Sequence, residues 1–320
     1  MFISVIITAY NRQEFLTDAV NSVLNQNLER KYYEIIVVKN FTDTNIDNFL
    51  NSNGIINIIM DGTIGEFLYK GISVSKGDVI SFLDDDDLFS HNKLTIIFEK
   101  FSNLCNYLHN SQKVFTSNEM DIKRYNTNNL SFNLSSISIR KELINMNFLR
   151  SIKTCPDNFI FYCALSKNAR ICSTDLKFTM YRLHNSTSVK MHNNIDEFIK
   201  MQYDVSEMIY KQLNEYKKMF PDLSKIIIND MLLNRFLMKI YNSKIKIGFT
   251  YYFRFIFSFM HGRKQSYEYK IGIIYMIMSL SPGIVKKAFI KKAFKKKSKH
   301  INAFIFIHKI SGILASIKIY

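Results

Sequence analysis

The stretch from Asp78 to Leu94 reads DVISFLDDDDLFSHNKL and places four adjacent carboxylates directly after an apolar run. Residues 79–83 form that run and have the length and apolar content of a strand buried on both faces. The carboxylates belong to Asp84, Asp85, Asp86 and Asp87. Because adjacent like charges repel, such a group needs either bulk water or a cation around it.

The residues before this stretch alternate between strand and helix patterns. Strands are predicted at 3–9, 33–38, 55–59 and 78–83, and helices at 12–26, 45–52 and 64–75. This alternation predicts an α/β fold, a Rossmann-like, mostly parallel sheet flanked by helices. Since ligands of such sheets bind at the carboxyl ends of the strands, residues 8–12, 39–43 and 84–87 are expected to line one crevice.

The second half of the chain has weaker patterns. It predicts helices at 91–104, 157–167 and 196–219, strands at 113–118 and 176–184, and a strand entering a helix across 135–144. We therefore expect one α/β domain over residues 1–220 and a helical C-terminal extension over residues 221–320.

Charge is distributed unevenly along the chain. The formal net charge is +16, and all of this excess lies in residues 221–320, because residues 1–220 are neutral overall. An asymmetry of this kind suggests that the C-terminal region meets an anionic surface.

The C-terminal region alternates apolar and basic segments. Residues 245–260, 270–290 and 301–317 are aromatic and aliphatic, and none is a clean membrane span. Residues 286–300 carry eight lysines interleaved with apolar side chains, a pattern typical of a helix lying on an anionic membrane surface. A protein partner and nucleic acid are the alternatives, and we do not expect nucleic acid.

The four cysteines do not suggest a metal site or a disulfide framework. Cys105, Cys155, Cys163 and Cys172 form no CxxC pair. We expect free thiols in a reducing cytosol. The N-terminal residues enter a strand pattern at once, so no signal peptide is expected.

Carboxylates at a strand end provide the hard oxygen ligands that Mg²⁺ or Mn²⁺ prefers. An ion held by one or two carboxylates keeps positions open for phosphate oxygens. The alternative for Asp84–Asp87 is a solvated acidic turn.

Four segments together resemble a known family. They are ISVIITAYNR, GDVISFLDDDD followed by KL, PDNFIFYCAL and YRLHNSTS, and they lie in this order between Ile3 and Ser188. The chain is similar in these segments to family 2 glycosyltransferases with the GT-A fold. The resemblance implies transfer of a sugar, with inversion, from a nucleoside diphosphate to an acceptor hydroxyl.

The resemblance also implies roles for single residues. Asp84 and Asp86 match the family's DxD pair and, with His184, would hold Mn²⁺ or Mg²⁺; Asp85 and Asp87 offer the same spacing as an alternative register. The expected donor-binding residues are Thr8, Tyr10, Asn11, Arg12, Asp43, Asp84 and Asp85.

Asp157 matches the family's general base, and the chemistry asks for such a carboxylate because the acceptor hydroxyl must lose a proton as it attacks. Its alternative role is that of a helix N-cap. Arg140 and Arg182 are expected as further contacts to the diphosphate or the acceptor.

Three positions depart from the family pattern. Lys39-Asn40 stands where the family has an acidic pair, Phe67-Leu68-Tyr69 stands where it has Ala-Arg-Asn, and Pro156 replaces a glutamate. The first two leave the identity of the donor open.

We expect the acceptor to be a lipid-linked glycan or another envelope glycoconjugate at the cytoplasmic face of the cell membrane, with the protein peripheral or monotopic. The alternative is a non-catalytic nucleotide-sugar-binding or membrane scaffold protein derived from the same fold.

Overall fold

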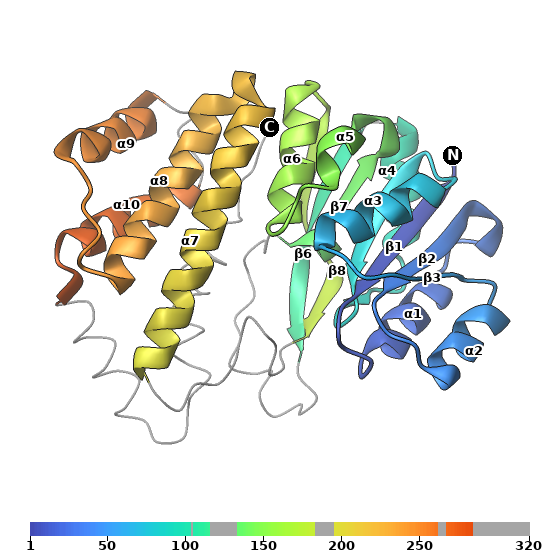
Figure 1. Cartoon of the computed structure of the whole chain (residues 1–320). Helices are drawn as coiled ribbons and strands as arrows, with labels where there is room; N and C mark the ends of the chain where they lie inside the picture. The colour runs from blue at the N-terminus through green and yellow to red at the C-terminus, as the bar shows by residue number, and fades with distance from the viewer. Residues whose placement is uncertain (104, 116–132, 183–194, 262–266, 284–320) are drawn as a thin grey trace. The chain divides into compact units, whose positions relative to one another are not determined.

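The computed structural model describes residues 1–103, 105–115, 133–182, 195–261 and 267–283. Contacts divide the chain into two units, residues 1–183 and residues 184–318 (Figure 1). The domain boundary expected at residue 220 therefore falls inside the second unit.

A sheet of eight strands forms the centre of the first unit, in the order β3-β2-β1-β4-β7-β6-β8-β5 (Figure 1). The strands are β1 Ile3–Ala9, β2 Tyr33–Lys39, β3 Ile56–Ile59, β4 Val79–Asp84, β5 Leu88–Phe89, β6 Tyr107–Phe115, β7 Ile137–Arg140 and β8 Ile171–Arg182. Strands β1 to β4 pair with one another in parallel, and β6 pairs with β8 in parallel. Strand β7 pairs antiparallel with β4 and β6, and β5 pairs antiparallel with β8. The mostly parallel sheet predicted from the sequence is confirmed.

Helices connect these strands. They are α1 Leu16–Leu24, α2 Thr44–Ser52, α3 Ile64–Val74, α4 Lys93–Asn103, α5 Met146–Leu149 and α6 Pro156–Ser166. Helix α1 begins later than the predicted 12–26, because the residues that follow β1 form a loop.

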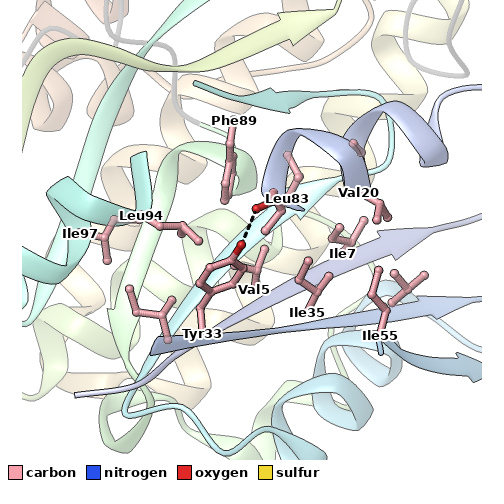
Figure 2. Close-up of a cluster of buried hydrophobic side chains, with 14 of the residues drawn as sticks. Val5, Ile7, Val20, Tyr33, Ile35, Ile55, Leu83, Phe89, Leu94 and Ile97 are labelled. Carbon is pink, nitrogen blue, oxygen red and sulfur yellow. Dashed lines mark hydrogen bonds between the residues drawn. The ribbon is translucent and has the colours of Figure 1, made fainter. Parts of the chain in front are cut away.

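The two faces of the sheet are covered by different helices. Val5, Ile7 and Tyr33 pack with residues of α1 and α4 in one apolar cluster, where the Tyr33 hydroxyl donates a 3.0 Å hydrogen bond to the Val23 carbonyl (Figure 2). On the other face, Ile36 and Val38 of β2 pack against Phe67 of α3. Alternate residues of each central strand are therefore buried on opposite faces, which explains their continuously apolar sequences.

The later strands differ from their predicted bounds. Strand β6 begins at Tyr107, before the predicted 113–118, and its first six residues include buried polar side chains such as Asn110 and Gln112. Strand β8 begins at Ile171, before the predicted 176–184. The segment 135–144 contains only a short strand between two 3₁₀ turns, Leu134–Ser136 and Lys141–Leu143.

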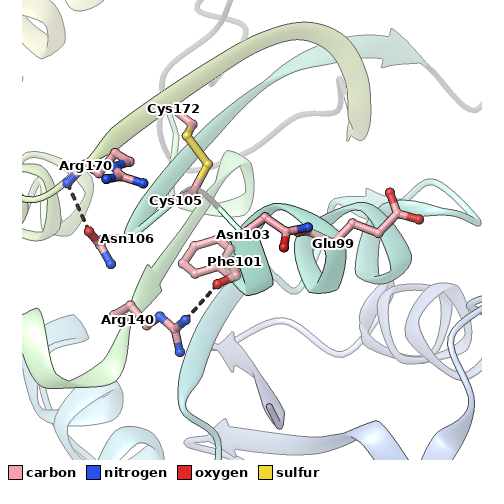
Figure 3. The surroundings of a disulfide bond; sticks show 8 residues. All are labelled: Glu99, Phe101, Asn103, Cys105, Asn106, Arg140, Arg170 and Cys172. Atoms are coloured by element: carbon pink, nitrogen blue, oxygen red, sulfur yellow. Dashed lines mark hydrogen bonds between the residues drawn. A yellow bond between two sulfur atoms is a disulfide. The ribbon is translucent and has the colours of Figure 1, made fainter.

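The expectation of four free thiols was wrong. Cys105 and Cys172 form a disulfide with a Cα–Cα distance of 5.8 Å, which joins the segment after α4 to β8 (Figure 3). Cys155 and Cys163 are not part of a disulfide. The paired cysteines lie 67 residues apart in the sequence, so their spacing does not predict the bond. They become neighbours only in the folded sheet.

The second unit is helical, as predicted for the C-terminal region. Its helices are α7 Ile195–Met219, α8 Ser224–Tyr241, α9 Phe249–His261 and α10 Tyr267–Leu280. Phe236 of α8, Phe255 of α9 and Tyr275 of α10 share a buried apolar cluster. Among the described residues, no helix combines the length and the apolarity needed to cross a bilayer. The predicted lysine-rich helix 286–300 and the segment 301–317 lie outside the described residues.

Gly65 allows two segments of the first unit to approach closely. A Cβ at this position would lie 2.1 Å from the Leu149 carbonyl oxygen and 2.7 Å from that of Ile152. The Gly65 amide donates a 3.0 Å hydrogen bond to the Ile152 carbonyl. The N-terminus of α3 is therefore joined directly to the segment that precedes α6.

We predict that Gly65→Ala lowers the free energy of unfolding by about 1–3 kcal/mol, because backbone oxygens cannot move aside as a flexible side chain could. The measurement is chemical denaturation of both proteins. Gly248→Ala is the matched control, since a Cβ there meets only ordinary contacts of 3.6 Å or more. Equal stability of the Gly65→Ala and wild-type proteins would contradict the prediction.

Candidate functional site

The loops after β1, β2 and β4 meet at the carboxyl edge of the sheet. Thr8 pairs with Asp84 in the register between β1 and β4. Asn11 and Asn40 exchange two hydrogen bonds. The backbone N–H of Asn11 donates to Asn40 Oδ1 at 2.7 Å, and the side-chain Nδ2 of Asn40 donates to Asn11 Oδ1 at 2.8 Å. The structure therefore brings these loops together, as expected from the carboxyl ends of parallel strands.

Arg12 neutralises part of the acidic stretch. Its guanidinium forms an ion pair with Asp85 and a second one, at 2.8 Å, with Asp86. Asp85 is 3% exposed. Asp85 is therefore turned toward Arg12, and one oxygen of Asp86 faces the same guanidinium.

Asp84, Asp86 and Asp87 form a group in which one oxygen of each lies within 4.8 Å of the others. Two of them, Asp84 and Asp86, are the predicted metal ligands. The third, Asp87, was named from the sequence only as part of the alternative register with Asp85. His184, the third predicted ligand, lies outside the described residues.

The acidic group is electrostatically unfavourable without a cation. Burial, followed by the charges of Asp87, Asp86 and Asp85, raises the pKa of Asp84 well above its usual value. Burial and then the Asp86 charge raise the pKa of Asp87 to about 7. A carboxylate oxygen set of this kind fits a divalent ion, which would replace the protons that these raised pKa values retain.

Two hydrogen bonds hold the Asp87 carboxylate. Its carboxylate accepts a 3.0 Å hydrogen bond from the Arg182 amide and another of 3.0 Å from Asn133 Nδ2. The charge of Asp87 also acts on Lys93, which is fully buried. Burial lowers the pKa of this lysine well below its usual value. These contacts fix the orientation of the Asp87 carboxylate.

Lys93 was not predicted, although the sequence contains a signal for it. The residue lies on the buried stripe of α4 with Leu94, Ile97 and Phe101. Its ammonium donates to the Ser135 carbonyl and, at 3.0 Å, to Thr179 Oγ1. A lysine at an apolar position of an amphipathic helix indicates a buried cation with partners of its own.

Arg182 supports the acidic stretch from β8. Its Nε donates to the Asp86 carbonyl at 2.9 Å, and its Nη2 pairs with Asp18 at 2.9 Å. The guanidinium carbon also lies 4.3 Å from the centre of the Phe15 ring. The structure brings Arg182 to the site, where it contacts the acidic segment and α1.

Arg140 does not lie at this site. It pairs with Val79, at the amino end of β4, whereas the carboxylates follow the opposite end of that strand. Its guanidinium donates a 2.7 Å hydrogen bond to the Phe101 carbonyl (Figure 3). The predicted contact of Arg140 with a diphosphate therefore has no support in the structure.

Asp157 lies in the first turn of α6, after Pro156. The N-cap is Cys155, so Asp157 does not have the capping role that was its alternative. Burial raises the pKa of Asp157 to about 6. The Asp157 charge also adds to the burial that raises the pKa of Tyr107, whose hydroxyl has no hydrogen-bond partner within the described part of the chain.

The remaining predicted donor-binding residues lie at the same edge. Tyr10 is 61% exposed, and its ring centre lies 6.1 Å from that of Phe67. Asp43 is the N-cap of α2, accepting from the Ile46 amide at 3.0 Å. Lys39, which departs from the family pattern, is buried and pairs with Asp47 at 2.8 Å.

Comparison with known sequences gives a family match. The model of the family described as "Glycosyl transferase family 2" matches residues 4–165, which is more than half of the 320 residues. An "Uncharacterized glycosyltransferase" from Rickettsia bellii (strain RML369-C) is 30% identical over 161 residues, which is 48% of this chain and 21% of that protein. The "Poly(ribitol-phosphate) beta-glucosyltransferase" of Bacillus spizizenii (strain ATCC 23059 / NRRL B-14472 / W23) is 29% identical over 29% of this chain and 16% of its own length. The chain thus spans about a fifth or less of these curated relatives.

Solved structures share the fold over most of the chain. S. aureus TarS 1-349 in complex with UDP-GlcNAc matches with a TM-score of 0.53 and 14% identity, covering 92% of each chain. The mannosyltransferase PcManGT from Pyrobaculum calidifontis, in complex with GDP-Man and Mn²⁺, matches with a TM-score of 0.51 and 9% identity, covering 89% of this chain and 86% of its own. The predicted GT-A-like α/β fold with a helical C-terminal region is confirmed.

We predict that Mn²⁺ stabilises the protein more at pH 8 than at pH 5. The pKa values of Asp84 and Asp87 are raised in the fold, so the metal-free protein loses stability as pH rises from about 4, the usual Asp value, to about 7. Mn²⁺ at about 100 times its Kd would restore about 2.7 kcal/mol at the higher pH. The measurement is the Tm with and without Mn²⁺ at each pH.

Asp86→Ala should lose this Mn²⁺ response, whereas Asp175→Asn, a change at an exposed aspartate of β8, should keep it. A Mn²⁺-induced shift of Tm that is the same at pH 5 and pH 8, or that survives Asp86→Ala, would show that the acidic group is not the binding site.

Proposed function

The chain belongs to glycosyl transferase family 2, and from that membership we propose that it transfers a sugar from a nucleoside diphosphate to an acceptor hydroxyl. The observation that carries the proposal is the group formed by Asp84, Asp86 and Asp87 beside Arg12, at the sheet edge where ligands of α/β folds bind.

The donor is proposed to be a nucleotide sugar. TarS was solved with UDP-GlcNAc and PcManGT with GDP-Man, which supports this class of donor. Thr8, Tyr10, Asn11, Arg12 and Asp43 lie on the loops that would surround its nucleoside. Asp84 and Asp85 complete the proposed donor-binding set.

A divalent ion, Mn²⁺ or Mg²⁺, would be held by Asp84 and Asp86, with Asp87 as a third oxygen ligand. When bound, such an ion supplies Lewis-acid stabilisation of the negative charge that develops on a leaving diphosphate. Asp87 is held by Asn133 and by the Arg182 amide, so its carboxylate orientation is fixed before any ligand arrives. Arg12 balances the remaining charge of Asp85 and Asp86.

Asp157 is proposed as the general base of an inverting transfer. A base must be ionised at working pH yet basic enough to accept the acceptor's proton. Its pKa of about 6 meets both requirements. The hydrogen bond between Gly65 and Ile152 ties the segment before α6 to the N-terminus of α3, which follows the carboxyl end of β3.

The acceptor is proposed to be a hydroxyl of a lipid-linked glycan or another envelope glycoconjugate, reached at the cytoplasmic face of the cell membrane. The excess of +16 in residues 221–320 supports association with an anionic membrane surface. The protein would then be peripheral or monotopic.

The test is release of nucleoside diphosphate from a panel of UDP- and GDP-sugars with and without Mn²⁺. We predict metal-dependent turnover of at least one donor, abolished by Asp86→Ala and reduced about 100-fold or more by Asp157→Asn. The Asp157→Asn protein should still show a Mn²⁺-dependent thermal shift with the donor, and Asp175→Asn should behave as wild type.

A donor that binds with Mn²⁺ while no donor turns over would favour the non-catalytic alternative. Full activity of the Asp157→Asn protein would remove Asp157 from the role of base.

The pH dependence of transfer gives a separate prediction. Since the ionised form of Asp157 is the base, kcat/KM should fall about tenfold per pH unit below about 6 and level off above it. Initial rates between pH 4.5 and 8, at saturating Mn²⁺, measure this profile. A rate that stays flat down to pH 5 would contradict it.

A further inference from the structure

Helix α9 exposes aromatic side chains on a face that does not point into the core. Tyr252 and Phe255 are buried in the apolar cluster of the second unit. Phe249 is 73% exposed and Phe253 is 61% exposed. Ile256 and Phe257 are 37% and 63% exposed. The helix therefore has an apolar face toward the core and a second apolar face toward the outside.

The exposed residues form one continuous stripe. Phe249, Phe253 and Phe257 follow each other at intervals of four, which places them on one side of an α-helix, with Ile256 beside them. The ring centres of Phe249 and Phe253 lie 5.3 Å apart. We call Phe249, Phe253, Ile256 and Phe257 the α9 stripe. Contiguous exposed apolar surface of this kind marks an interaction site.

The surroundings of the α9 stripe are basic. Lys244 and Lys246 are exposed just before the helix, and Arg254 is exposed on it. Between residues 231 and 267 the sequence has seven Lys or Arg residues and no Asp or Glu. An apolar stripe with cations beside it along the chain complements a surface that is apolar inside and anionic outside.

We propose that the α9 stripe inserts into the headgroup boundary of a bilayer that contains anionic lipid, with Lys244, Lys246 and Arg254 at the lipid phosphates. The 13 residues of α9 span about 20 Å, which is shorter than the hydrocarbon core, so the helix lies in the plane of the interface. Phenylalanine enters the acyl boundary while the basic side chains remain at the headgroups.

A second copy of the chain fits this surface less well. A symmetric contact between two α9 stripes would bring the same basic residues of both copies together, and their like charges repel. The proposal rests on the membrane association proposed above for residues 221–320, and it concerns only the second unit. Its outcome is therefore distinguishable from that of the sugar-transfer experiments, which vary Asp86 and Asp157 in the first unit.

The first experiment uses the absence of tryptophan from the sequence. Phe253→Trp in the full chain makes a single fluorescent reporter on the α9 stripe. With vesicles of phosphatidylglycerol and phosphatidylcholine, we expect a blue shift of its emission and quenching by acyl-brominated lipid. Met208→Trp, at a residue of α7 that is 47% exposed, is the matched control and should show neither effect.

The second experiment measures vesicle binding by flotation. Phe249→Ser combined with Phe253→Ser should lower the partition coefficient about tenfold or more, because two large apolar side chains no longer leave water. Met208→Ser combined with Ile226→Ser, at two exposed apolar residues elsewhere in the unit, should leave it unchanged. Phosphatidylcholine alone should bind the wild-type chain more weakly, and added salt should weaken the binding to anionic vesicles.

Three results would overturn the proposal. The first is an emission of the Phe253→Trp protein that is already blue-shifted without vesicles and does not respond to them. The second is a blue shift that depends on protein concentration, which would indicate a second copy. The third is unchanged flotation of the Phe249→Ser, Phe253→Ser protein, which would place the lipid contact in another part of the chain.

Discussion

Four adjacent carboxylates at the end of β4 repel one another, and side chains from much of the first unit are arranged around this repulsion. Buried like charges of this kind are stable only with cations or strong donors around them. Arg12 supplies a cation from the loop after β1, whereas burial lowers the pKa of Lys93 on α4. Asn133 and the backbone of Arg182 donate to Asp87. Segments far apart in the sequence are thus held around one acidic stretch.

These contacts divide the four carboxylates into different roles. Asp85 is neutralised by Arg12 within the protein, whereas Asp84 and Asp87 keep raised pKa values. The uncompensated negative charge therefore lies in the group of Asp84, Asp86 and Asp87. A cation bound there would relieve the repulsion that the folded protein retains. The stability of the fold is thereby linked to the proposed binding of a diphosphate.

The sequence predicted the sheet and the position of the acidic group because continuous apolar strands ending in polar loops give a strong pattern. It did not predict the first half of β6, where buried polar side chains such as Asn110 hide the strand. The disulfide of Cys105 and Cys172 and the ion pair of Arg182 with Asp18 join residues far apart along the chain, so neither has a local signal. Arg140 was placed at the site from resemblance alone, and the strand register puts it at the other end of β4.

The most direct measurement of the central claim is anomalous scattering from Mn²⁺ in crystals of the full chain grown with a nucleoside diphosphate. We expect one strong peak bonded to carboxylate oxygens of Asp84 and Asp86 and to phosphate oxygens of the nucleotide. A nucleotide bound at this edge of the sheet with no Mn²⁺ on these aspartates, or Mn²⁺ bound at another place, would contradict it.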